Sequence, residues 1–356
     1  MSTAAIIGCG DVSTIHTEAL ATMADTNIVA VCDTDPRRLA TAAEQHGVPG
    51  FADHLTLLDA LRPDVVHICT PHNEHASLAI DFLTRDVNVI VEKPLAHSVS
   101  EGRRLVQVAE QSTAKIAVCF QNRYNTTAQA MHTLLSSGEL GEVRGGCATV
   151  LWHRSADYYR DRPWRGTWIG GGGGVLMNQA IHTVDLLQWL LGDVSSISGH
   201  AATRFLGDTI EVEDTAEFVA EHVGGARSVF YATLAHAVNA PVAIDVVTEK
   251  ATLSLRGDLT VSYANGEVVV IPERRAPSGG RSYWGVSHEI LIRDFYTHLD
   301  HPEPFWISPR EAAKSLKIVQ DIYQQSYPAS AATEPATAAA DKTDHTRTRP
   351  LQASAT

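Results

Sequence analysis

Residues 4–13 read AAIIGCGDVS, a short apolar run that leads through two glycines into a segment with helical spacing. An apolar run of this length predicts a buried strand. Gly8 permits the tight turn, and Gly10 lets the main chain approach a pyrophosphate held by the N–H groups of the next helix. The stretch predicts the start of a dinucleotide-binding domain with Asp11 and Val12 beside the cofactor; the alternative is a tight loop without a ligand.

Asp33 ends the second apolar run, at the usual distance of about 20 residues from the glycines of such a site. A carboxylate there accepts hydrogen bonds from the adenosine ribose, which favours NAD as the cofactor. Arg37 and Arg38 follow closely and can instead reach a 2′-phosphate, so NADP is not excluded.

The first part of the chain, residues 1–121, alternates short apolar runs with helical segments. We expect strands at 4–8, 28–33, 64–70, 88–91 and 115–120, and helices at 12–23, 36–46, 55–61, 72–85 and 98–111. Asp35 before Pro36, and Ser98 before Glu101, are helix-start signals. This alternation predicts an α/β Rossmann domain, a doubly wound parallel sheet.

The strict alternation of predicted strands and helices ends in residues 122–327. For this part of the chain we expect a substrate-binding and oligomerisation domain of the α+β class. Helices are predicted at 126–136, 177–191, 287–299 and 309–325, and strands at 142–153, 196–205, 215–222, 227–236, 242–255 and 268–271. These strands predict a large, mostly antiparallel, open-faced sheet with helices on one side, and a homodimer or homotetramer formed through the open face. The last helix is a candidate to pack back on the Rossmann domain. Residues 328–356 are rich in Ala, Thr, Ser and Pro, which predicts a disordered tail.

Composition excludes several classes of function. A net charge of −13 disfavours binding to nucleic acid. The chain has no apolar run of the roughly 20 residues that cross a bilayer, and no secretory signal is visible. Its five cysteines form no CxxC pair, and its seventeen histidines give no convincing ligand set. We therefore expect a cytoplasmic protein that acts on a small molecule, without a membrane, a metal or nucleic acid.

Glu92-Lys93-Pro94 follows the fourth predicted strand and so lies at the carboxyl edge of the sheet, where open α/β sheets bind ligands. A lysine beside an oxidised, cationic nicotinamide has its ammonium form disfavoured and can act as an acid or base near neutral pH. We expect Glu92 to help orient Lys93.

With these residues in place, the sequence resembles the Gfo/Idh/MocA oxidoreductase family, named after glucose-fructose oxidoreductase and inositol dehydrogenase. The resemblance runs to about Tyr323. Its motifs occur in the family's order: Gly8-Cys9-Gly10 with His16, Thr70-Pro71 with His75, Glu92-Lys93-Pro94, Gly138-x-x-Gly141, the run from Gly171 to His182, and Asp294-Phe295-Tyr296.

The resemblance implies a catalytic acid/base at Lys93 and a histidine, His182, that contacts the reacting hydroxyl. It also implies that Pro71 lies near the nicotinamide, in a cofactor site that takes in Thr70, His72, His75 and Glu92. The family commonly has Asp four residues before the histidine, where this chain has Asn178. Because positions i and i+4 share a helix face, we expect Asn178 and His182 to point into one site. Asn cannot take a proton, which shifts proton transfer to Lys93, and Asp185 is a candidate to hold the imidazole; a satisfied core histidine is the alternative for His182.

Other candidates for substrate binding lie in polar and aromatic loops. Arg123 is predicted where the domains meet, and either binds substrate or forms an interdomain ion pair. Tyr158, Trp164 and Arg165 belong to a loop whose aromatic faces suit sugars and whose arginines suit carboxylates or phosphates, with a subunit contact as the alternative. His72 and His75 lack metal-site spacing and are expected to orient loops.

The expected function is an NAD(P)-dependent dehydrogenase that transfers a hydride at a secondary hydroxyl carbon of a sugar, an inositol-like polyol or a sugar derivative. Two other functions remain open from the sequence. One is an NAD-dependent glycosidase that oxidises a sugar transiently and eliminates the glycoside. The other is a non-catalytic NAD(P)-binding regulator.

Overall fold

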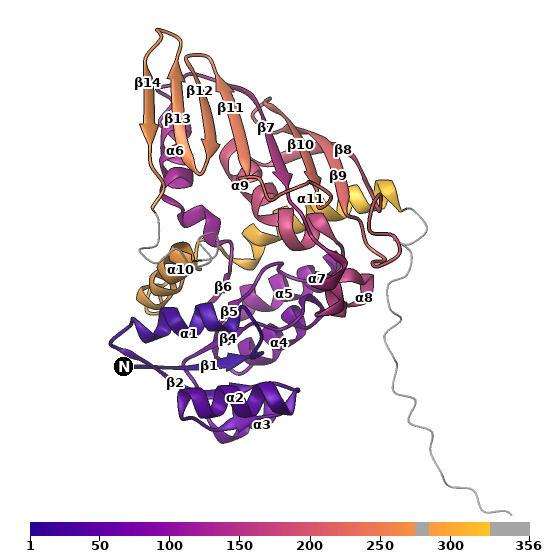
Figure 1. Ribbon diagram of the computed structural model, residues 1–356. Helices are drawn as coiled ribbons and strands as arrows, with labels where there is room; N and C mark the ends of the chain where they lie inside the picture. The colour runs from indigo at the N-terminus through magenta and orange to yellow at the C-terminus, as the bar shows by residue number, and fades with distance from the viewer. Residues whose placement is uncertain (275–284, 328–356) are drawn as a thin grey trace, which may run out of the picture.

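The computed structural model describes residues 1–274 and 285–327 as two domains, each built on one sheet (Figure 1). The tail expected to be disordered, residues 328–356, lies outside the described residues.

The first domain holds a six-stranded sheet in the order β3-β2-β1-β4-β5-β6, in which every neighbouring pair is parallel. Its strands are β1 (Ser2–Ile7), β2 (Thr26–Cys32), β3 (Gly50–Phe51), β4 (Val65–Ile68), β5 (Asn88–Val91) and β6 (Ile116–Val118). This order places the carboxyl ends of β1 and β4 side by side at the point where the winding reverses, and the loops after them meet there. The predicted Rossmann fold is confirmed.

Helices connect these strands, and the predicted start signals cap two of them. They are α1 (Ser13–Ala21), α2 (Pro36–His46), α3 (His54–Ala60), the 3₁₀ turn η1 (His72–Glu74), α4 (His75–Leu83) and α5 (Val99–Gln111). Asp35 accepts from the main-chain N–H groups of Arg37 and Arg38, and Ser98 accepts from that of Glu101. Such caps satisfy N–H groups that have no partner within the helix.

The second domain holds an eight-stranded sheet in the order β14-β13-β12-β11-β7-β10-β9-β8. Its strands are β7 (Val143–Leu151), β8 (Val194–Ala202), β9 (Thr215–His222), β10 (Arg227–Thr233), β11 (Ala243–Thr248), β12 (Ala251–Arg256), β13 (Asp258–Tyr263) and β14 (Val268–Ile271). All neighbouring pairs are antiparallel apart from β7 and β10. The sequence pattern missed β13 and predicted one strand over 242–255, because the apolar periodicity continues through the tight turn between β11 and β12.

The remaining helices cover one face of this sheet or link the domains. They are η2 (Gln121–Tyr124), α6 (Thr126–Ser136), α7 (Ala156–Arg160), η3 (Pro163–Gly166), α8 (Trp168–Gly171), the π-helix η4 (Val175–Ala180), α9 (Ile181–Leu191), α10 (Gly285–Thr297) and α11 (Pro309–Ser326). Helix α9 packs on β7, and α11 packs on β8. Helix α11 also packs on α5, and α10 packs on α1, so both last helices contact the first domain.

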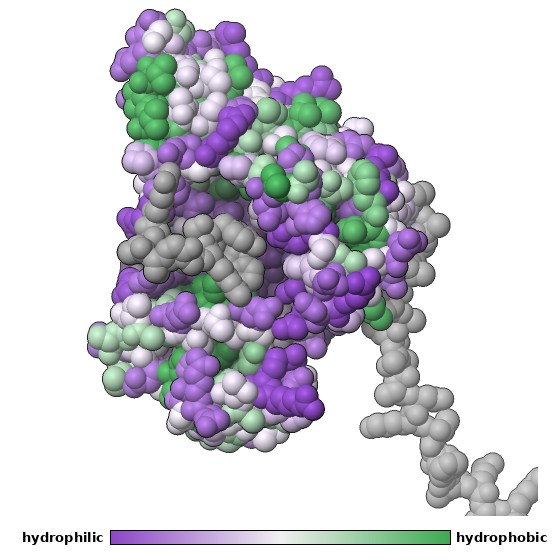
Figure 2. All heavy atoms as spheres, viewed as in Figure 1, coloured by the Kyte–Doolittle hydropathy of each residue, from purple (hydrophilic) through white to green (hydrophobic). Residues whose placement is uncertain are grey.

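The other face of the second sheet is open. Val229 and Tyr231 of β10 and Val247 of β11 point away from the helices and are exposed. Apolar side chains also gather over β14, where Val268 and Val270 are exposed, and Figure 2 shows the surface hollowed between the two domains. In the parts of the chain that the structure describes, no helix combines the length and apolar character needed to span a membrane.

Candidate functional site

The loop after β1 has the geometry that a pyrophosphate requires. Gly8 has a φ of 90°, and a Cβ on it would lie 2.8 Å from the main-chain carbonyl of Cys69, so only glycine fits the turn. A Cβ on Gly10 would instead meet nothing within 4 Å. Open space in front of the α1 N-terminus is where a dinucleotide phosphate would lie. These residues, with Val12 as the residue that precedes α1, therefore fit the cofactor.

Asp33 lies at the end of β2 with its carboxylate buried and shared among several donors. It accepts from the N–H of Cys9 at 2.8 Å and from that of Asp35 at 2.7 Å. The guanidinium of Arg38, which is partly exposed, binds both carboxylate oxygens at 3.1 and 3.2 Å. Asp33, which favours NAD, and Arg38, which can instead reach the 2′-phosphate of NADP, therefore form one ion pair.

The loop after β4 reaches the same edge. The hydroxyl of Thr70 is buried and bonds no atom of the described residues, so it remains available to a ligand. Pro71 precedes η1. His75 bonds the main-chain oxygens of Pro94 and Thr70, and His72 bonds that of Gly171 at 2.8 Å. Both histidines thus join loops, as expected from the sequence.

Lys93 follows β5 at this edge and points toward the second domain. Its Nζ donates to the main-chain oxygen of Asn178 at 2.7 Å. Burial lowers the pKa of Lys93 to about 8; the Glu92 carboxylate acts to raise it, and Arg165 lowers it further. A lysine with this pKa holds both protonation states near neutral pH, as an acid/base catalyst must.

The helix that carries Asn178 and His182 differs from the prediction. Residues 175–180 form a π-helix, and α9 begins only at Ile181, so the two residues do not share a regular i, i+4 face. A π-turn leaves main-chain groups without their usual helical partners, and such turns are frequent at functional sites. Here the oxygen of Asn178 is the group that receives Lys93.

His182 is a partly buried imidazole whose Nδ1 is enclosed and bonds no atom of the described residues. Burial holds the pKa of His182 well below its usual range, and Lys93 acts in the same direction. The imidazole is therefore neutral, and its enclosed Nδ1 is an unsatisfied polar atom. The alternative of a satisfied core histidine does not fit.

Asp185 does not hold His182, contrary to the prediction. Its carboxylate receives two hydrogen bonds of 2.7 Å from Arg123 and one of 2.9 Å from Ser315. Arg123 also binds Glu311 at 3.1 Å, and its side chain is 1% exposed. The guanidinium is therefore buried, with its Nε and Nη2 bound to carboxylates. Its assignment to substrate binding is therefore corrected to the ion pair, which joins η2, α9 and α11.

Tyr158 of the aromatic loop lies beside the catalytic candidates. Its hydroxyl is 3.3 Å from Nδ2 of Asn178 and 3.2 Å from Nε2 of Gln179. The guanidinium of Arg165 stacks on its ring at 4.4 Å. Trp164 packs edge-on against His72, with ring centroids 4.8 Å apart. These contacts bring the predicted loop to the site from the side of the second domain.

Asp11 links that loop to the nucleotide end. Its carboxylate, partly exposed, lies 3.2 Å from Arg162 and 3.5 Å from Arg165. Two arginines of the second domain therefore lie beside the loop that precedes α1, where a pyrophosphate would also attract them.

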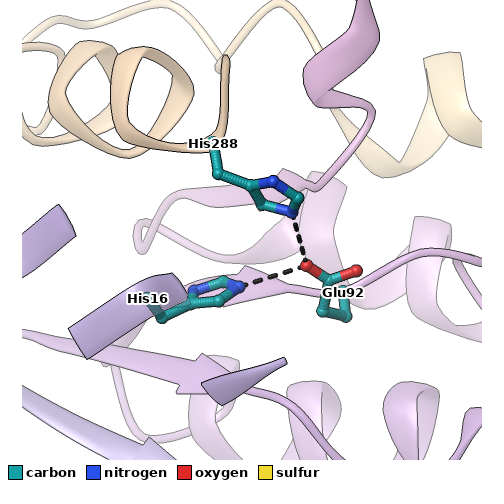
Figure 3. Close-up of side chains that lie close together, drawn as sticks. All are labelled: His16, Glu92 and His288. Carbon is teal, nitrogen blue, oxygen red and sulfur yellow. Dashed lines mark hydrogen bonds and ion pairs between the residues drawn. The ribbon is translucent and has the colours of Figure 1, made fainter. Parts of the chain in front are cut away.

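Glu92 orients Lys93 only through the main chain, because its Oε2 accepts from the N–H of Lys93 and not from Nζ. Figure 3 shows its Oε1 between His16 of α1 and His288 of α10, each 3.1 Å away. Burial alone would raise the pKa of Glu92, but the bonds from both histidines hold it well below its usual range.

The same three residues bring possible metal-ligand atoms within 4.8 Å of one another. Glu92 is ionised and accepts, so both Nε2 atoms donate to it, and Nδ1 of His16 is left to accept from His67 at 2.9 Å. Tyr296 then donates to the other nitrogen of His67 at 3.0 Å. Every nitrogen named here has a partner, so the cluster needs no ion to satisfy it.

Sequence reasoning missed several polar residues that support this site. His67 and His288 lie in apolar segments without a motif, and Glu213 precedes a strand. Glu213 is fully buried and accepts from the main chain of the π-helix. Their only signal in the sequence is a charged or polar residue within a buried run.

Comparison with protein families identifies both domains. The family described as "Oxidoreductase family, NAD-binding Rossmann fold" matches residues 3–120, and "GFO/IDH/MocA C-terminal domain" matches residues 128–254. The chain belongs to the Gfo/Idh/MocA oxidoreductase family, and its first domain is the NAD-binding domain of that family.

Curated relatives include D-apiose dehydrogenase of Rhizobium rhizogenes, 29% identical over 63% of this chain and 64% of the relative. Inositol 2-dehydrogenase of Rubrobacter xylanophilus is 30% identical over 52% of this chain and 51% of the relative. The chain thus matches between half and two thirds of the length of these relatives.

Solved structures cover more of the chain. The WlbA dehydrogenase of Bordetella pertussis, in complex with NADH and UDP-GlcNAcA, has a TM-score of 0.78 and 28% identity, over 90% of this chain and 95% of that one. A levoglucosan dehydrogenase in complex with NADH has a TM-score of 0.81 at 22% identity, over 91% of this chain and 98% of that one, and shows the shared fold.

Proposed function

We propose that this member of the family is an NAD-dependent dehydrogenase acting on a secondary hydroxyl of a sugar, a polyol or a sugar derivative, with Lys93 as its acid/base. The observation that carries the proposal is the position of Lys93. It stands at the carboxyl edge of the NAD-binding sheet, has a pKa of about 8 and is fixed to the helix segment that carries His182. Oxidation of an alcohol needs a base of this kind next to the hydride acceptor.

The nicotinamide of bound NAD supplies the hydride acceptor. In the oxidative direction neutral Lys93 takes the hydroxyl proton on Nζ. The C–H electron pair leaves with the hydride, and the C–O bond becomes a carbonyl. In the reverse direction the Lys93 ammonium returns the proton to the carbonyl oxygen. Protons and electrons balance with one hydride and one proton removed from each alcohol.

His182 and Asn178 position the hydroxyl in this proposal. The neutral imidazole can share one hydrogen bond with the hydroxyl but does not compete with Lys93 for the proton, because its pKa is well below the usual range. The Asn178 side chain is placed by the Tyr158 hydroxyl. The loop with Tyr158, Trp164 and Arg165 would then cover the rest of the sugar.

The cofactor would lie against the glycine loop, Asp33 and the loop after β4. Gly10, Asp11 and Val12 would face the pyrophosphate, Asp33 the adenosine ribose, and Thr70 with Pro71 the nicotinamide end, where Glu92 and Lys93 also lie. The Asp33–Arg38 pair favours NAD, since a 2′-phosphate would be repelled by the carboxylate.

The named substrates of the relatives support a sugar or polyol. Curated relatives are dehydrogenases of apiose and inositol, and one solved relative holds a nucleotide sugar. A homo-oligomer formed through the open sheet face is also part of the proposal, because Val229, Tyr231 and Val247 expose apolar surface there.

A substrate panel tests the function. The purified protein is mixed with NAD or NADP and with inositols, aldoses, glycosides and nucleotide sugars, and absorbance of the reduced nicotinamide is followed. Formation of NADH with one class of sugar supports the proposal. Release of an aglycone without net NADH would favour the glycosidase, and tight NADH binding without turnover in either direction would favour a regulator.

A further inference from the structure

Glu213 lies just before β9, 39 residues along the chain from Gly174, the last glycine of the run, whose N–H it binds. Its Oε2 accepts from the N–H of Gly174 at 2.8 Å, and its Oε1 accepts from that of Leu176 at 2.9 Å. Its main-chain oxygen accepts from the N–H of Val175 at 3.0 Å. The first N–H groups of a helix lack internal partners, and a negative charge there is favourable. Glu213 therefore caps the π-helix from a distant segment.

Tyr323 of α11 completes this arrangement by donating to Oε1 of Glu213 at 2.7 Å. A Cβ on Gly174 would collide with the main-chain oxygen of Glu213, and one on Gly173 would collide with the Tyr323 hydroxyl. The close approach of Glu213 and Tyr323 therefore accounts for two glycines of the run. All three groups that reach the carboxylate are donors, so the arrangement fits its ionised form.

The capped segment leads directly to the group that binds Lys93. The N–H of Asn178 donates to the oxygen of Gly174 at 2.9 Å, and the oxygen of Asn178 accepts from Lys93. A shift of residues 174–176 would thus move the acceptor of the lysine. The carboxylate of Glu213 bonds Gly174, Leu176 and Tyr323, and among the described residues no hydrogen bond or ion pair joins it to Lys93 or His182.

We propose that Glu213 is a positioning residue for Lys93: by capping the π-helix it holds the Asn178 oxygen against the lysine ammonium and so sets the acid/base balance of Lys93. The inference rests on the proposed role of Lys93 in the dehydrogenase. Because the hydrogen bond to Asn178 favours the charged lysine, its loss would lower the pKa of Lys93.

The charged groups that act on Lys93 are distinct from those that bond Glu213. Glu92, Arg165 and Cys119 act on Lys93, and none of them bonds Glu213. Burial raises the pKa of Glu213 to about 7, although its hydrogen bonds from Tyr323, Leu176 and Gly174 act in the opposite direction.

The neighbours of Glu213 are phenols and one other carboxylate. Burial raises the pKa of Tyr159 and of Tyr323, and raises that of Tyr327 to about 12. The carboxylate of Asp214 faces the main-chain N–H groups of residues 204–206 instead. None of these tyrosines changes charge near neutral pH.

The test measures the pH at which Lys93 becomes reactive, and it needs no substrate. The full chain is treated with acetic anhydride over a range of pH, and acetylation of Lys93 is quantified by peptide mass spectrometry. The unaltered protein should show half-maximal reactivity near pH 8. Glu213→Gln should move this midpoint to lower pH; a shift of about half a unit gives roughly threefold more labelling at neutral pH.

If Glu213 had only a structural role, the pH midpoint of Lys93 labelling would shift in the opposite direction. If the variant only loosened the site, water would reach Lys93 and its midpoint would rise toward that of a free lysine. Tyr323→Phe removes one donor and should lower the midpoint by a smaller amount, which keeps the test open if Glu213→Gln does not fold. Glu267→Gln, on an exposed turn, is the matched control and should leave the midpoint unchanged.

An unchanged or higher midpoint in a folded Glu213→Gln protein, or in Tyr323→Phe when that variant alone folds, would overturn the inference. A lowered midpoint in a protein that turns over no sugar or polyol would instead leave Glu213 as the positioning residue and remove the proposed dehydrogenase.

Discussion

The Nζ of Lys93 and the main-chain oxygen of Asn178 lie 2.7 Å apart and join the two domains of the protein at one point. The lysine comes from the edge of the NAD-binding sheet, and the oxygen comes from a π-helix of the second domain. A single hydrogen bond therefore fixes the acid/base candidate of one domain to the helix segment that carries the substrate-binding candidates of the other.

The pH dependence of turnover should follow Lys93. Because its pKa is lowered to about 8, the neutral base becomes available as the pH rises through 8, and sugar oxidation should accelerate over that range. Carbonyl reduction needs the ammonium and should slow over the same range. Steady-state kcat/KM in both directions against pH checks this. Parallel pH profiles for the two directions would contradict it.

Removing the carboxylate of Asp33 should weaken the preference for NAD. In Asp33→Ala the Arg38 guanidinium loses its partner and becomes available to a 2′-phosphate. Loss of one charge-assisted contact and of the repulsion predicts a change of about tenfold or more in the ratio of NADPH to NADH dissociation constants. Nicotinamide fluorescence titration measures both. Glu44→Gln removes an exposed charge from the other end of α2 and should leave the ratio unchanged.

The local signals of the first domain were sufficient to predict much of the fold and part of the site. Gly8, Gly10, Asp33 and Lys93 each lie next to a strand end, so strand prediction alone brings them to one edge of the sheet. The strand order then follows from the winding rule of such domains.

What the sequence could not predict depends on contacts between distant segments. The π-turn over residues 175–180 changes which groups face Lys93, and its cap, Glu213, is 39 residues away. Asp185 is close to His182 along the chain, yet it bonds Arg123, 62 residues distant. Periodicity within a helix does not reveal a partner of this kind.

The Arg123–Asp185 pair should be important for stability and not for substrate recognition. Asp185→Asn leaves the buried guanidinium with Glu311 alone, and breaking a buried pair costs about 3 kcal/mol of unfolding free energy. Urea unfolding followed by circular dichroism measures the loss. Asp157→Asn breaks the exposed Arg160–Asp157 pair and should cost about 0.5 kcal/mol or less. Equal losses in the two variants would contradict the buried role.

The open sheet face should govern the oligomeric state. Tyr231→Glu places a charge among exposed apolar residues of β10 and should shift the assembly toward monomers, because an unpaired charge is costly at a buried interface. Size-exclusion chromatography with light scattering reports the mass. Val223→Glu, in the exposed turn between β9 and β10, should leave the mass unchanged. If Tyr231→Glu keeps the mass of the unaltered protein, this face does not form the interface.

The central claim is that Lys93 performs the proton transfer, and Lys93→Ala tests it most directly. Turnover of the sugar identified in the substrate panel and the dissociation constant for NADH are measured on the same preparations. The account predicts that turnover falls by a factor of about 10² or more, as for other lost acid/base groups, while NADH binding stays nearly unchanged. A variant that turns over the sugar at the original rate, or that loses NADH binding as severely as turnover, would contradict the assignment of Lys93 as the acid/base.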